Sequence, residues 1–257
     1  MFFRGREVLL YLSLLYQGEW EEIYRAIQEK KPLIKEEIEK VVQSFHTPYL
    51  TILDEDYPEA LKQVYRPPFV LFYYGDKSLL SQPGIAVIGS RNCSEYGKEC
   101  TRKLVREIAD SFVIVSGFAR GIDRVAHETA IEAQGKTIAI LGTGIDYVYP
   151  SEQRDLYEKI KKDHLILSEY PSFCEGKKEH FPFRNRLIAA LGEGILVTEA
   201  KERSGTNYTI RYGLEMGKDI FCVPYPLSMV SSTNRLIQEG AFLVEKGEDI
   251  LKELKRK

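Results

Sequence analysis

The chain has 257 residues, enough for one large domain or two small ones. Hydrophobic residues make up 44% and charged residues 29%, so the composition excludes a disordered, collagen-like or disulfide-rich scaffold. Lys and Arg number 36 against 38 Asp and Glu, and the net charge of −2 gives no sign of a globally basic protein. Residues 1–80 hold 10 basic and 13 acidic side chains, which leaves 26 and 25 for residues 81–257. Any polyanion site must therefore be a local patch.

The four cysteines and four histidines predict no metal site, because they show neither a C-x-x-C pair nor zinc-finger spacing. Scattered thiols are typical of a reducing compartment. The N-terminal apolar segment Val8–Tyr16 is about ten residues long and lacks a cleavage site, and no apolar run of about 18 residues occurs. We expect a soluble, cytoplasmic protein with no membrane partner.

Helical periodicity marks the first 45 residues. Apolar residues recur at i, i+3, i+4 and i+7 between Trp20 and Ile27, and Thr47-Pro48 ends the pattern. We predict a small helical domain over residues 1–46, which leans on a second domain at 47–257 because so short a segment buries little core. Its helices are expected at Glu7–Tyr16, Trp20–Lys30 and Lys35–Phe45.

Short apolar runs then alternate with longer amphipathic stretches. The runs predict strands at Phe69–Tyr74, Ile85–Ile88, Phe112–Val115, Thr137–Leu141, Leu165–Leu167, Ile195–Thr198 and Ile220–Val223. The stretches predict helices that include Tyr96–Asp110, Ile122–Ala133, Ser151–Lys162 and Thr206–Met216. This alternation is typical of βαβ units. We predict an α/β fold with a doubly wound, Rossmann-like, mostly parallel sheet covered on both faces.

Small and basic residues follow several predicted strands, where ligands of open α/β sheets bind. Gly89-Ser90-Arg91 offers a tight turn and a guanidinium suited to phosphate, although a plain turn with a solvated arginine fits as well. Ser116-Gly117 opens a small-residue loop that contains Arg120, and Ser204-Gly205 opens a helix. Backbone N–H groups at such helix starts favour anions.

Cationic and aromatic residues are interleaved on a predicted loop ahead of the apolar Leu187–Leu191. Single-stranded nucleic acid needs such a set, because cations follow the phosphates and aromatic faces stack on bases, at about 1–3 kcal/mol each. The alternative is a solvated loop with its phenylalanines in the core. The residues concerned are Lys177, Lys178, Phe183, Arg184, Asn185 and Arg186.

A series of motifs, each weak alone, resembles the DNA-processing protein A (DprA/Smf) family over roughly residues 46–250. Their order and compatible spacing make the resemblance strong. They are Gly89-Ser90-Arg91, SGFARGIDRVAH at 116–127, Gly142-Thr143-Gly144 through Tyr149-Pro150, Ser168-Glu169-Tyr170-Pro171, FPFRNR at 181–186, Glu199-Ala200 through Ser204-Gly205, and Asn234-Arg235-Leu236-Ile237 through Gly240-Ala241.

The resemblance implies an extended Rossmann fold that binds single-stranded DNA without cutting it. Family members protect incoming strands in natural transformation and load the RecA recombinase for homologous recombination. By motif, Arg91 is the principal DNA-contacting arginine, and a lysine before FPxRN, here Lys177 or preferably Lys178, also contacts DNA. The family forms homodimers through the C-terminal part of the sheet domain, which here includes Leu236, Ile237, Phe242 and Val244.

Two other function classes stay open. A phosphoribohydrolase of the lysine-decarboxylase-like (LOG) type also has a Glu near a Gly-Thr helix start, as Glu199 and Gly205-Thr206 are here, but its P-G-G-x-G-T-x-x-E run is absent. A dimeric protein-interaction platform is the other class.

His127, four residues after Asp123, is favoured as a core or surface histidine over a catalytic one. Without G-x-G-x-x-G or G-x-x-x-x-G-K-[ST], a dinucleotide cofactor and P-loop NTP hydrolysis are unsupported. The resemblance implies a protein that is not an enzyme, and we expect no cofactor.

Overall fold

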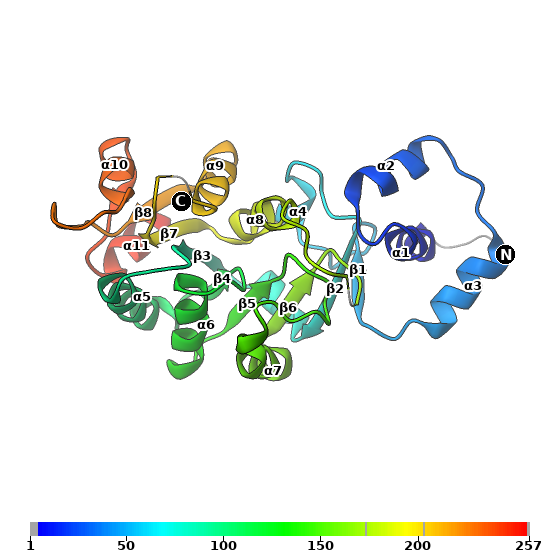
Figure 1. The fold of residues 1–257 in the computed structure, drawn as a ribbon, viewed down its shortest axis with the longest axis horizontal. Coiled ribbons are helices and arrows are strands. Elements are labelled where there is room, and N and C mark those ends of the chain that lie inside the picture. The colour runs from blue at the N-terminus through cyan, green and yellow to red at the C-terminus, as the bar shows by residue number, and fades with distance from the viewer. Residues whose placement is uncertain (1–4, 173, 203, 256–257) are drawn as a thin grey trace.

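One sheet runs through the molecule (Figure 1). A computed structural model describes residues 5–172, 174–202 and 204–255, and over these ranges the strand order is β1-β2-β6-β5-β4-β3-β7-β8-β9. The strands are β1 (Tyr49–Thr51), β2 (Val70–Gly75), β3 (Gly84–Gly89), β4 (Val113–Ser116), β5 (Thr137–Ile140), β6 (Leu165–Ser168), β7 (Gly194–Glu199), β8 (Asp219–Cys222) and β9 (Phe242–Leu243).

The sheet is parallel from β6 to β9, and only its β1-β2-β6 end is antiparallel among the strands described. Strands β4, β5, β6 and β7 are buried along their whole length. Continuous burial requires apolar residues on both faces, which is why these strands read as unbroken apolar runs. The predicted doubly wound, mostly parallel α/β fold is confirmed.

Helices cover both faces of the sheet (Figure 1). One face carries α5 (Glu95–Ile108), α6 (Ile122–Glu132), α7 (Arg154–Asp163) and α11 (Gly247–Leu254), and the other carries α4 (Glu59–Lys62), α8 (His180–Leu191), α9 (Thr206–Glu215) and α10 (Thr233–Gln238). Two 3₁₀ turns, η1 (Lys77–Ser81) and η2 (Ser151–Gln153), complete these elements. Over the described ranges, no helix is long and apolar enough to cross a lipid bilayer.

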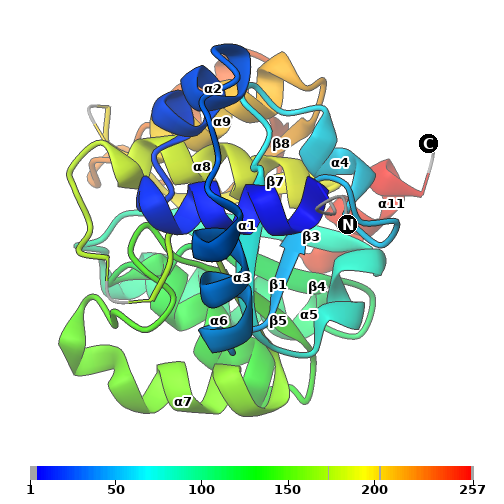
Figure 2. The same ribbon diagram turned by 90° about the vertical axis from the view of Figure 1, so that its right-hand side faces the viewer.

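The predicted N-terminal helices are α1 (Gly5–Leu15), α2 (Trp20–Gln28) and α3 (Lys35–Ser44), which face the viewer in Figure 2. Leu9 and Leu10 of α1 are buried in one cluster with Phe72 of β2. The Trp20 indole N–H donates to the Pro67 carbonyl oxygen at 2.8 Å. The helices therefore share a core with the sheet, while the boundary between residues 46 and 47 stays a prediction.

The FPFRNR segment is helical, so the predicted loop is wrong. Helix α8 begins at His180 and places Pro182 in its first turn. N–H groups of a first turn lack intrahelical acceptors, so proline breaks nothing there. Because residues two apart point to nearly opposite sides of an α-helix, Arg184 and Arg186 face different surroundings.

Candidate nucleic-acid interface

The loops after β3 and β7 meet where the winding of the sheet reverses. From β3 the sheet extends through β4, β5 and β6 on one side and through β7 and β8 on the other. Ligands of open α/β sheets bind in the crevice at this reversal. Here the crevice is a cavity of about 420 Å³. Its lining includes the predicted residues Gly89, Ser90, Arg91, Ser204 and Gly205, together with Lys201.

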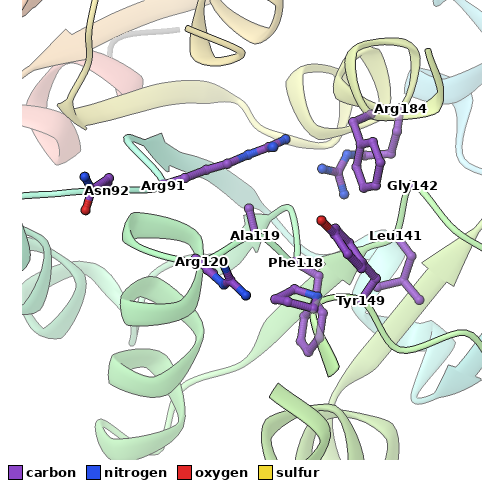
Figure 3. Close-up of a pocket in the computed structure, with 11 residues that line it drawn as sticks. Arg91, Asn92, Phe118, Ala119, Arg120, Leu141, Gly142, Tyr149 and Arg184 are labelled. Carbon is purple, nitrogen blue, oxygen red and sulfur yellow. The ribbon is translucent and has the colours of Figure 1, made fainter. Parts of the chain in front are cut away.

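A second cavity, of about 280 Å³, adjoins the first. Arg91 and Arg184 line both cavities. Figure 3 shows the two guanidinium groups directed toward each other across the opening, with Tyr149 beside it. The rings of Phe118 and Phe181 complete an apolar wall. One cavity thus offers polar groups and a cation, and its neighbour offers aromatic faces.

Phe181 lies at the centre of the aromatic wall. Its ring centroid is 5.7 Å from the Arg91 guanidinium carbon and 5.7 Å from the Tyr149 ring centroid. Gly142 makes this placement possible, because a Cβ atom there would lie 2.8 Å from the Phe181 ring. The Tyr149 side chain is half exposed, so a planar ligand can reach its ring from solvent.

Arg184 supplies a buried positive charge. It is 4% exposed and donates to the Ile140 carbonyl oxygen and to the Asn185 side chain. Among the described residues, no carboxylate forms an ion pair with it. Burial lowers its pKa to about 10, with the nearby Asp123 carboxylate opposing the shift, so it stays charged at neutral pH. A desolvated guanidinium that no described carboxylate contacts directly favours an anion in the adjoining cavity, and the nearby buried Asp123 carboxylate offsets part of its charge.

Three exposed cations of interest have no ion-pair partner within the part of the chain that the structure describes: Arg91, Lys178 and Lys201. Arg91 and Lys201 line the larger cavity, and Lys178 lies two residues before α8. Sequence reasoning missed Lys201, although its place just after β7 was a usable signal.

Two other predicted cations are already paired. The exposed Arg120 side chain donates to Glu152, and Lys177 donates to Glu19. Each pair offsets the positive charge of its basic residue. Lys178 therefore differs from Lys177 in being free of an acidic partner among the described residues.

Arg186 and Phe183 line neither cavity. The burial of Arg186 corrects the expectation that its side chain contacts DNA, whereas for the partly buried Phe183 the contact stays a prediction. The Arg186 side chain is completely buried, and its guanidinium forms a two-pronged pair with Glu169 at 2.6 and 2.7 Å. It also donates to the Arg66 carbonyl oxygen. Phe183 packs over this guanidinium at 3.7 Å, while Phe181 lines the cavity in its place.

Ser116 and Gly117 are also buried, so a direct contact with DNA is excluded for the Ser116 side chain. Its hydroxyl donates to the Val87 carbonyl oxygen at 2.6 Å. Asn185 is partly buried and donates to the Gly205 carbonyl oxygen at 3.2 Å, which ties α8 to the loop after β7. Arg203, beside Ser204, lies outside the described residues.

Glu199, the carboxylate that a phosphoribohydrolase would use as acid or base, holds the start of a helix in place. It is 4% exposed, and its Oε2 accepts from the Ser94 backbone N–H at 2.9 Å and hydroxyl at 2.6 Å. The Tyr225 hydroxyl donates to the same oxygen at 3.0 Å. Since Ser94 is the N-cap of α5, Glu199 anchors the start of that helix.

His127 is a core histidine, as favoured from the sequence. It is fully buried, with Nδ1 2.6 Å from the Thr137 hydroxyl and Nε2 2.5 Å from the Gly117 carbonyl oxygen. Burial lowers its pKa to about 4, so the ring is neutral at neutral pH. Asp123 bonds to the Ala119 backbone N–H at 3.3 Å and not to His127.

The residues predicted for a dimer interface differ in exposure. Phe242 of β9 is 38% exposed at the edge of the sheet, and its neighbour Leu243, which was not predicted, is 47% exposed. Leu236 and Ile237 of α10 are partly buried against the core. Val244 is 1% exposed and packs in the core, so its expected place at an interface is corrected.

Comparison with known proteins identifies the family. The model of the DNA recombination-mediator protein A family matches residues 48–255. The chain belongs to this family. It is 44% identical over 218 residues to DNA processing protein DprA of Streptococcus pneumoniae, covering 84% of this chain and 77% of the relative. It is 41% identical over 209 residues to DprA of Bacillus subtilis, covering 80% and 70%.

Two solved structures of family members share the fold. That of DNA processing protein A from S. pneumoniae has a TM-score of 0.82 at 37% identity and covers 97% of this chain and 93% of its own. That of the Helicobacter pylori protein has a TM-score of 0.74 at 32% identity and covers 82% and 97%. The latter is described as giving insight into a single-stranded DNA binding mode.

Proposed function

We propose that this family member binds single-stranded DNA across the two adjoining cavities. The observation that carries the proposal is the meeting of the unpaired Arg91 guanidinium with the Phe181 and Tyr149 rings beside the buried charge of Arg184. Cations at this edge neutralise phosphates, and the aromatic faces accept bases. Of the predicted contacts, we keep Lys178 and the residues that line the cavities, and we add Lys201 and Phe181. The cavity residues kept are Gly89, Ser90, Arg91, Arg120, Arg184, Asn185, Ser204 and Gly205.

We infer that the chain binds DNA without cutting it. The phosphoribohydrolase alternative needs Glu199 as a free acid or base, and this carboxylate is buried under bonds from Ser94 and Tyr225. A carboxylate that holds the start of α5 is poorly placed to exchange protons with a substrate. The position of Glu199 therefore disfavours the phosphoribohydrolase alternative.

We further propose that the protein protects incoming strands and loads the RecA recombinase onto them, acting as a homodimer. Membership in a family of DNA recombination mediators supports recombinase loading. The exposed Phe242 and Leu243 support a second copy as partner, because an edge strand offers unpaired backbone groups and apolar side chains together.

The test is fluorescence anisotropy with a labelled oligothymidine and a matched duplex over a salt series. We expect the single strand to bind and the duplex to bind much more weakly, because stacking requires unpaired bases. Three free cations predict that log K falls with log salt at a slope of about −2, from about −0.7 for each phosphate neutralised. Equal affinity for the duplex, or binding independent of salt, would contradict the proposal.

A further inference from the structure

The turn between α1 and α2 reaches the segment that carries Lys177 and Lys178. Gly18 has a φ of +76°, and a Cβ atom there would lie 2.5 Å from the Glu169 carbonyl oxygen. Glycine is therefore required for the turn to pack this closely. Next to it, the Cys174 thiol lies 3.9 Å from the Gln17 carbonyl oxygen. The N-terminal helices are thus in contact with the chain just ahead of α8.

Glu19 makes the polar contacts of this junction. Its carboxylate accepts from Lys177 Nζ and lies 3.2 Å from His180 Nε2. His180 is 3% exposed, and its ring stacks on Tyr170 with centroids 3.9 Å apart. Because Nδ1 accepts from the Lys177 backbone N–H at 3.4 Å, Nε2 carries the proton donated to Glu19. The carboxylate is therefore held in place by a buried ring.

The charge on Glu19 is stable at this position. Partial burial opposes its ionisation, but the hydrogen bonds from Lys177 and His180, together with the charge of Lys177, outweigh burial and lower the pKa of the carboxyl. Its negative charge faces Lys177, while the neighbouring Lys178 has no acidic partner among the residues described. The two adjacent lysines just ahead of α8 thus differ in electrostatic state.

We propose that Glu19 selects the lysine that contacts DNA: it neutralises Lys177 and leaves Lys178 to bind phosphate. The inference rests on the proposed single-stranded DNA binding and gives the N-terminal helices a part in it. Glu19 acts through Lys177 and is not itself a contact. Removing its charge should release a further cation to the strand.

The experiment measures oligothymidine affinity of the full chain between about 50 and 200 mM salt, the range in which phosphate contacts change affinity most. Glu19→Gln keeps an oxygen that accepts from His180 but removes the charge. We expect it to raise affinity about two- to fivefold, the strength of one exposed ion pair. We also expect the salt slope to steepen by about 0.7, for one more phosphate contact.

A double-mutant comparison assigns the gain to Lys177. In the wild-type background, Lys178→Ala should make the slope shallower by about 0.7, and Lys177→Ala should leave it nearly unchanged. In the Glu19→Gln background, Lys177→Ala should restore the wild-type slope. Glu22→Gln is the matched control, because it removes a charge from the first turn of α2 where the partner is Arg25, at 3.1 Å.

The outcomes separate this inference from the proposed function. If wild type binds but Glu19→Gln leaves the slope unchanged, or Lys177→Ala and Lys178→Ala cost wild type equally, the inference fails alone. An equal gain in Glu22→Gln also overturns it, because the effect would then be general. If wild type fails to bind oligothymidine even at about 50 mM salt, the proposed function and the inference both fail.

Discussion

Replacing Arg91 with alanine should weaken oligothymidine binding by about tenfold to a hundredfold, the strength of a hydrogen bond to a charged group. Arg91 lines both cavities and lies over Phe181, and no described acidic residue pairs with it. Since phosphate contacts position a strand without reading it, the loss should be similar for every base sequence. Fluorescence anisotropy measures it directly.

Arg106→Ala is a suitable control for Arg91→Ala. Arg106 lies on α5, is about half exposed and pairs with Glu132 at 3.0 Å. Its loss should change affinity little. If Arg91→Ala bound oligothymidine as tightly as wild type, with the fold intact, Arg91 would not be the central contact and the site would have to be moved.

Replacing Arg186 with alanine should cost the fold about 3–5 kcal/mol, because it leaves the buried Glu169 carboxylate without its partner. The two side chains are 0% and 6% exposed, with nitrogen–oxygen distances of 2.6 and 2.7 Å. Urea unfolding should show the midpoint falling with an unchanged slope. The loss would be one of stability, whereas Arg91→Ala should leave the midpoint near that of wild type.

A double variant tests whether the stability loss comes from leaving the Glu169 charge unpaired. A double variant, Arg186→Met with Glu169→Leu, removes both charges and should recover much of the lost stability, since apolar pairs of similar size often replace buried ion pairs. An Arg186→Ala protein that unfolds at the wild-type midpoint but binds DNA poorly would contradict the structural role and restore Arg186 to the binding site.

The alternation of strands and helices could be predicted from the sequence, because the central strands of the sheet are buried on both faces and therefore appear as apolar runs. Strand β7 shows this: all six of its residues are buried, and its centre, Ile195 to Val197, is an apolar run. Strand β1 escaped prediction because three residues carry too little periodicity. The first half of helix α8 was predicted as a loop, because Pro182 and the charged residues Arg184 and Arg186 interrupt the apolar pattern of a helix there.

The cations of the site could not be sorted from the sequence. Arg184 and Arg186 look equivalent there, but one borders a cavity and the other pairs with Glu169. The choice between Lys177 and Lys178 depends on Glu19, which is 158 positions from Lys177. Such partners are set by tertiary packing, so local composition predicts that a basic patch exists and not which of its charges are free.

The central claim is that a single strand lies over Arg91 with its bases against the aromatic wall. The most direct test is photocrosslinking of the protein to an oligothymidine that carries iododeoxyuridine, followed by mass spectrometry of the linked peptides. The account predicts crosslinks to Phe181 or Tyr149, and their loss in Arg91→Ala. Crosslinks confined to α10 and β9, or to the N-terminal helices, would contradict it.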